Sequence, residues 1–173
     1  LDGTLWVENG TPYMIYCHEW VEVMDGEMCM VELKKDLSAP VGQPVRLFCA
    51  SAADWALKGK TDDPGKHTFV TDGCFLYRTS AGKLLMIWSS FSNGSYAIGI
   101  AESATGKVHG PWRQQKDLLF AKHGGHGMLF NDFDGRLCLV LHAPNSPGGK
   151  ERAHIYEIED VGNTLRLKGE IAR

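Results

Sequence analysis

The pattern of apolar and polar residues repeats three times along the chain, and each repeat predicts a β-hairpin. In the middle repeat Asp72 opens an apolar strand, Gly82 marks a turn, and Leu84–Trp88 returns as a second apolar run. Short runs of this kind, bounded by Gly, Asn and Asp turns, are typical of antiparallel strands. The same order begins at Asp2 and again at His126. Helical periodicity is weak throughout, so we expect an all-β fold.

Each repeat continues beyond its hairpin with further strand-like runs. The predicted strands are 4–8, 13–17, 27–33 and 45–49, then 75–78, 84–88 and 96–102, and finally runs within 126–140, 153–158 and 165–167. Such units are typical of β-propeller blades, although the segment 51–67 must be a polar, loop-like insertion. Residues 1–173 are therefore predicted to form one partial propeller domain of about three blades. The order of the repeats argues against the alternative, a β-sandwich.

Composition and charge exclude several classes of partner. The net charge of −3 gives no reason to expect nucleic acid or an anionic membrane surface. No apolar run approaches the roughly 20 residues that span a bilayer. Five cysteines, with no pair in C-x-x-C spacing, argue against a disulfide framework or a zinc site. They are instead expected to be small buried hydrophobes.

Propeller topology predicts where polar side chains converge. The innermost strand of every blade lines the central channel, so Asp2, Asp72 and His126 should surround one mouth. The second strand of each blade returns to the same face and ends there. It adds the residues His18, Glu19, Trp20, Phe91, His142 and Asn145. Carboxylates, imidazoles and aromatic walls in one cup are suited to binding a sugar and to acid–base cleavage of a glycosidic bond.

At these residues the sequence resembles glycoside hydrolase family 43. The motifs are Asp-Gly-Thr-Leu-Trp from Asp2, Val-Thr-Asp-Gly before Cys74, Gly-Pro-Trp ending at Trp112, and Gly-Gly-His-Gly around His126. The resemblance implies a five-bladed propeller that hydrolyses α-L-arabinofuranosides and β-xylosides with inversion. It also implies that this chain is a fragment, and that its partners are the remaining blades upstream of Leu1.

The resemblance implies roles for three carboxylates. Asp2 is similar to the family's Asp that orients and tunes the general acid. Asp72 stands where that acid opens a blade, but the family's common Glu-Gly-Pro is here Asp-Gly-Cys, so either Asp72 or Glu19 is expected to be the acid. The catalytic base would lie on a blade upstream of Leu1. His126 is similar to a histidine that joins a calcium or water site in the channel; no other cofactor is implied.

The expected function is hydrolysis of arabinofuranosyl or xylosyl linkages in plant-type glycans. The residues expected to contact the carbohydrate are His18, Trp20, Phe91, His126, His142 and Asn145. A non-catalytic carbohydrate-binding propeller is the alternative, and a protein-interaction propeller is a third interpretation. The sugar, the linkage and exo or endo action stay open. Export is slightly favoured as the location, although five cysteines also fit a reducing compartment.

Overall fold

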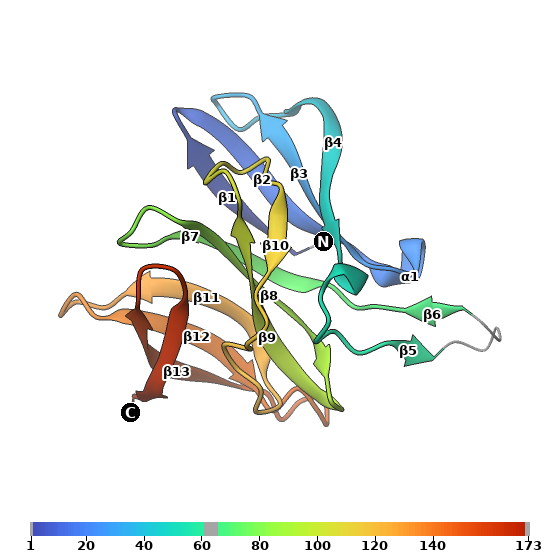
Figure 1. Cartoon of the computed structure of the whole chain (residues 1–173), viewed down its shortest axis with the longest axis vertical. Coiled ribbons are helices and arrows are strands. Elements are labelled where there is room, and N and C mark those ends of the chain that lie inside the picture. The colour runs from blue at the N-terminus through green and yellow to red at the C-terminus, as the bar shows by residue number, and fades with distance from the viewer. Residues whose placement is uncertain (1, 61–65, 172–173) are drawn as a thin grey trace.

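The computed structural model describes residues 2–60 and 66–171. Within these ranges the strands form three four-stranded antiparallel sheets and one short hairpin (Figure 1). The first sheet contains β1 (Gly3–Glu8), β2 (Thr11–His18), β3 (Glu27–Leu33) and β4 (Pro40–Cys49). The second contains β7 (Asp72–Arg78), β8 (Leu84–Ser92), β9 (Ser95–Ser103) and β10 (Trp112–Gln114). The third contains β11 (Gly125–Asn131), β12 (Leu137–Ala143), β13 (Arg152–Asp160) and β14 (Leu165–Glu170).

The insertion between the first two sheets differs from its prediction as a polar loop. It holds the 3-10 turn η1 (Ala50–Ala52) and the hairpin β5 (Gly59–Lys60) and β6 (His67–Thr68). Its Trp55 packs on Trp88 of the second sheet, with ring centroids 4.6 Å apart. The segment is therefore anchored by an aromatic contact.

One α-helical turn, α1 (Trp20–Val23), follows β2 and was not predicted by the weak helical pattern. Its single turn is too short to show a periodicity of 3.6 residues. Among the described residues, no helix has the length and apolar character needed to cross a membrane.

The three large sheets lie side by side as consecutive blades, with β1, β7 and β11 as their inner strands. The middle inner strand, β7, contacts both β1 and β11, and Figure 1 shows its sheet between the other two. Each hairpin runs from its inner strand outward, in the order that the repeat predicts. The all-β, propeller-type fold is thereby confirmed.

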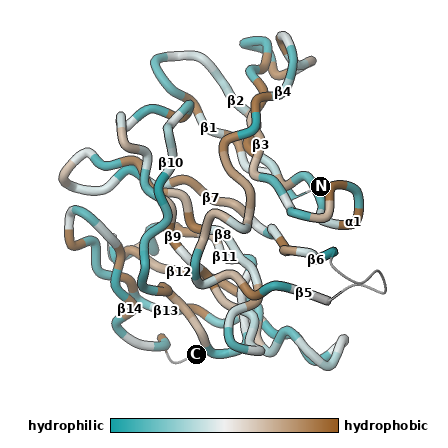
Figure 2. The backbone as a smooth tube through the Cα atoms, turned by 45° about the vertical axis from the view of Figure 1, so that its right-hand side comes forward, coloured by the Kyte–Doolittle hydropathy of each residue, from teal (hydrophilic) through white to brown (hydrophobic). Residues whose placement is uncertain are grey.

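The middle sheet is buried on both faces, and this explains the continuous apolar run of β8. Leu84, Met86 and Trp88 pack toward the first sheet, whereas Leu85 and Ile87 pack toward the third. A strand covered on both faces reads as an unbroken apolar stretch rather than an alternating one. Figure 2 shows this hydrophobic colouring around β7 to β9, in the middle of the molecule.

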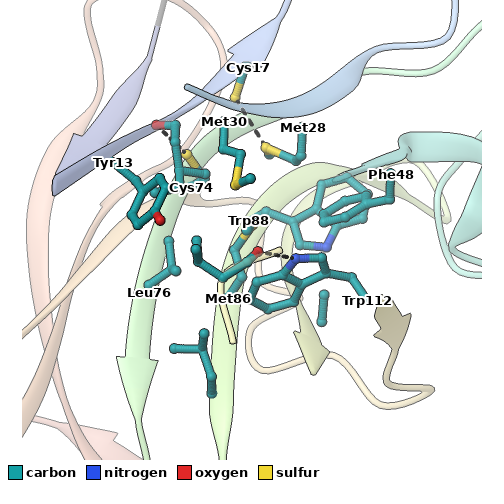
Figure 3. Close-up of a cluster of buried hydrophobic side chains, with 14 of the residues drawn as sticks. Tyr13, Cys17, Met28, Met30, Phe48, Cys74, Leu76, Met86, Trp88 and Trp112 are labelled. Carbon is teal, nitrogen blue, oxygen red and sulfur yellow. Dashed lines mark hydrogen bonds between the residues drawn. The ribbon is translucent and has the colours of Figure 1, made fainter. Parts of the chain in front are cut away.

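Sulfur and aromatic side chains fill the core between the first two sheets (Figure 3). Cys17 donates a weak hydrogen bond to the Met28 sulfur at 3.8 Å, and Cys74 donates one to the Ile15 carbonyl at 3.4 Å. All five cysteines are free thiols, and four of them are buried. The prediction that the cysteines are buried is confirmed for those four.

Truncation of Trp88 tests whether this core holds the first two sheets together. The Trp88 side chain is fully buried and contacts both Phe48 and Trp55. We expect Trp88→Ala to lower the free energy of unfolding by about 3–5 kcal/mol. Urea denaturation checks this value. The fully exposed Phe133 provides the control, because Phe133→Ala should change it by no more than about 0.5 kcal/mol; equal losses would contradict the assignment of the core.

Candidate active site

Three carboxylates converge where the inner strands begin. One carboxylate oxygen each from Asp2, Glu19 and Asp72 lie within 4.8 Å of one another. Asp2 precedes β1, Glu19 follows β2, and Asp72 opens β7. The cluster therefore spans the joint between the first two sheets, at the rim where the repeat predicts the strand starts to meet.

Irregular backbone at two strand starts turns the site residues toward this rim. The register of β7 on β8 shifts between Asp72 and Phe75, and that of β11 on β12 shifts between Gly125 and Met128. A bulge of this kind bends the strand and re-aims its side chains. Asp72 and His126 therefore leave the regular alternation of their strands.

His126 packs directly over Gly73, the residue that follows Asp72. A Cβ at position 73 would lie 2.7 Å from the imidazole ring, and Gly73 also has a positive φ of 39°. Glycine is therefore required there by both space and backbone conformation. The His126 backbone N–H donates to Ser89 Oγ at 2.8 Å, and its Nδ1 lies 3.7 Å from Asp2 Oδ2. His126 thus closes the third side of the cluster.

Tyr96 was missed by the sequence analysis and is the main hydrogen-bond donor to the cluster. Its hydroxyl donates to Asp72 Oδ2 at 2.8 Å. A side chain at position 125 would overlap the Tyr96 ring, so Gly125 makes room for it. Tyr96 pairs with Phe91 across β8 and β9. Its position opposite a predicted site residue could have identified Tyr96 as a member of the site.

Burial and mutual repulsion raise the pKa values of two of the carboxyl groups. For Glu19 the largest cause is burial, followed by the charges of Asp72 and Asp2. For Asp72 burial again raises the pKa most, the hydrogen bond from Tyr96 opposes it, and Asp2 raises it further. Among the described residues, no hydrogen bond is donated to the Glu19 carboxylate. Glu19 thus lacks the hydrogen bond that Asp72 receives from Tyr96.

A wall of rings extends from Tyr96 along the same rim. His142 stacks on Tyr96, with centroids 5.7 Å apart and planes inclined by 23°, while Phe91 tilts against Tyr96 at 5.2 Å. The His142 Nε2 is 2.9 Å from Asn145 Oδ1. The three predicted substrate contacts Phe91, His142 and Asn145 are thus linked through Tyr96.

The structure places the other two predicted contacts differently. The two ring nitrogens of His18 are each 3.0 Å from a carboxylate, one of Glu27 and one of Glu22. Neither glutamate belongs to the cluster of Asp2, Glu19 and Asp72, so His18 is engaged outside it. Trp20 begins α1, directly after Glu19, and is partly buried. Glu19 therefore lies in the chain between His18, which is paired with two other glutamates, and Trp20, which begins α1.

This arrangement can hold and deliver a proton. Like charges a few ångströms apart cannot all ionise, so one member of a carboxylate cluster keeps its proton to an unusually high pH. A buried, protonated carboxyl beside ionised partners is the electrostatic pattern of a general acid. The imidazole and aromatic wall beside it offers stacking surface and hydrogen-bond donors.

Comparisons with known proteins give a family and a fold. The family model of glycosyl hydrolases family 43 matches residues 1–160. An endo-arabinase from Bacteroides thetaiotaomicron is 43% identical, with a TM-score of 0.86 over 95% of this chain and 58% of that one. A thermostable family-43 glycoside hydrolase is 25% identical, with a TM-score of 0.76 over 98% of this chain and 57% of that one. This chain thus spans less than two thirds of the length of either relative.

A more distant structure is a family-43 β-xylosidase/α-arabinofuranosidase from a compost metagenome, in complex with xylotriose and in a calcium-free form. It is 13% identical, with a TM-score of 0.61 over 97% of this chain and 58% of that one, which shows a shared fold alone. No curated protein sequence matches the chain. The match over residues 1–160 and the identity of 43% to the endo-arabinase together show that the chain belongs to glycosyl hydrolases family 43.

Proposed function

We propose that the chain carries the acid side of a glycosidase site that cleaves arabinofuranosyl linkages in plant-type glycans. The observation that carries the proposal is the convergence of Asp2, Glu19 and Asp72 within 4.8 Å. The endo-arabinase at 43% identity favours arabinose-containing glycans over xylosides as substrates. An arabinan-type chain would lie across the rim formed by the starts of β1, β7 and β11.

Glu19 is the proposed general acid, and Asp72 is its ionised neighbour. The Tyr96 hydroxyl donates to Asp72 and so favours the anion of that carboxyl. Burial and the charges of Asp72 and Asp2 raise the pKa of Glu19, which favours its protonated form. Glu19 would then give its proton to the leaving oxygen, while Asp2 and Asp72 keep that proton in place before the reaction. This proposal favours Glu19 over Asp72, the alternative that the Asp-Gly-Cys motif left open.

The general base is proposed to lie outside this cluster. Acid and base of an inverting glycosidase stand roughly 6.5–9.5 Å apart, because a water molecule must fit between the base and the sugar. The oxygens of Asp2, Glu19 and Asp72 are closer than that, so none of the three suits the role of base to another. The proposed base is a carboxylate on a blade that precedes Leu1, consistent with the greater length of the relatives.

The wall around Tyr96 is the proposed sugar-binding surface. Phe91 can stack on a sugar ring, and His142 and Asn145 can hydrogen-bond hydroxyl groups. Trp20, next to Glu19 in sequence, is proposed to contact the sugar on the opposite side of the acid. His18 has the weakest support, since both of its ring nitrogens are engaged by Glu22 and Glu27.

Calcium in the channel stays a prediction, and no step of the proposed reaction uses it. Calcium takes about six to eight oxygen ligands. Among the described residues, the carboxylate that pairs with His126 is that of Asp2, whose Oδ2 lies 3.7 Å from the ring Nδ1. This pair is too small a donor set to hold calcium, so water or other parts of the protein would have to complete the site.

The first test is turnover by Glu19→Gln. We expect the rate on an aryl arabinofuranoside with a poor leaving group to fall by about 10²–10⁴-fold, since proton donation is lost. A substrate whose leaving group needs no protonation should recover most of the rate. Steady-state kinetics on the complete natural protein measure both values.

The matched control for this test is Glu32→Gln, an exposed glutamate on the same sheet, which should leave both rates unchanged. An equal loss with both substrates would contradict the role of Glu19 as acid. Sugar that raises the melting temperature without any turnover would favour the non-catalytic binding module instead.

The second test is the pH profile of Asp72→Asn. Removing this charge removes one cause of the raised pKa of Glu19, so the acid should lose its proton at a lower pH. The alkaline limb of kcat/KM is therefore expected to move to lower pH. Tyr96→Phe should move the alkaline limb in the same direction by a smaller amount, because Asp72 then loses the hydrogen bond that favours its anion. An alkaline limb that does not move in Asp72→Asn would contradict the electrostatic coupling.

A further inference from the structure

A second cluster of side chains lies on the first sheet, on the face opposite the buried core. His18 pairs with Glu27 across β2 and β3, and Cys29 follows two positions along β3, so all three point to one face. One imidazole nitrogen of His18, a carboxylate oxygen of Glu27 and the Cys29 sulfur lie within 4.8 Å of one another. We propose that His18, Glu27 and Cys29 form a binding site for a divalent ion of the zinc type.

The distances are close to those of a tetrahedral zinc site. Nδ1 of His18 is 3.0 Å from Glu27 Oε2, and the Cys29 sulfur is 3.9 Å from the same oxygen. Zinc bond lengths of about 2.0 Å to nitrogen or oxygen and 2.3 Å to sulfur place such ligands roughly 3.3 and 3.5 Å apart. Small side-chain adjustments therefore suffice, and the fourth position falls to water.

The outer shell that such a site needs is already present. A metal-binding histidine usually donates its other ring N–H to a carboxylate, and the His18 Nε2 is 3.0 Å from Glu22 Oε2. A metal-binding carboxylate is itself usually hydrogen-bonded. Arg46 donates to Glu27 Oε1 at 2.9 Å, so Oε2 is the oxygen that faces His18 and Cys29. Glu22 thus orients His18, and Arg46 orients Glu27, through atoms that do not face the proposed metal position.

Metal binding at this site conserves the charge of the cluster. Zinc replaces one proton of the Cys29 thiol and one proton of the His18 imidazolium, and both protons leave to solvent. A coordinated thiol is deprotonated by the metal itself.

The site is open to an arriving ion. The side chain of His18 is 35% exposed and that of Arg46 is 61% exposed, whereas Glu27 is 17% exposed. The ion would enter beside His18 and reach the buried Cys29 last. Because the proposal concerns metal binding alone, it stands independently of the proposed glycosidase activity.

The test uses the chelator-treated full chain with Co²⁺ as a spectroscopic probe and Zn²⁺ in competition. We expect one equivalent of Co²⁺ to produce a thiolate-to-metal charge-transfer band that Zn²⁺ abolishes. Glu22→Gln changes an exposed residue and should weaken zinc affinity by about 10–100-fold. Cys29→Ser should remove the band, while Cys138→Ala, on the third sheet, should retain it.

Two results would overturn the proposal. Wild-type protein that binds Co²⁺ without a thiolate band would place the ion at other ligands, such as the carboxylate cluster. Full zinc affinity in both Cys29→Ser and Glu22→Gln would exclude this site even if the band were seen.

Discussion

Electrostatic repulsion among three carboxylates is the main constraint on the structure of the site. Asp2, Glu19 and Asp72 lie within 4.8 Å of one another, and such a group is stable at neutral pH only if it keeps a proton or gains donors. Tyr96 supplies one donor to Asp72. The glycines at 73 and 125 leave space for His126 and Tyr96. The local backbone therefore accommodates a cluster of like charges, which hydrophobic packing alone does not explain.

Burial of the middle sheet on both faces offsets this unfavourable cluster. Alternate residues of β8 enter two separate cores, so the second sheet is fixed from both sides. Its inner strand β7 then contacts β1 and β11. Because β7 also carries Asp72, the most buried part of the fold holds the central carboxylate, and the flanking sheets bring Asp2, Glu19 and His126 to it.

The sequence predicted the topology well because repetition and hydrophobic pattern determine it. The bounds of β3, the strand starts near Asp2, Asp72 and His126, and the doubly buried Leu84–Trp88 all follow from local residue order. Side-chain partners that depend on register and bulges could not be predicted in the same way. The Tyr96 bond to Asp72 requires a bulge and a glycine on a third sheet. The cysteine spacing argued against a zinc site, whereas the proposed site would draw its ligands from two paired strands, which leave no linear motif.

The division of the site among sheets also ties its chemistry to assembly. Asp2 and Glu19 belong to the first sheet, Asp72 to the second and His126 to the third. If two sheets part while their own ladders survive, Glu19 loses the neighbouring charges that favour its protonated form. An incompletely docked molecule would then lack the proposed acid although most of its secondary structure is intact. In the proposed mechanism, the protonated form of Glu19 would therefore depend on correct docking of the sheets.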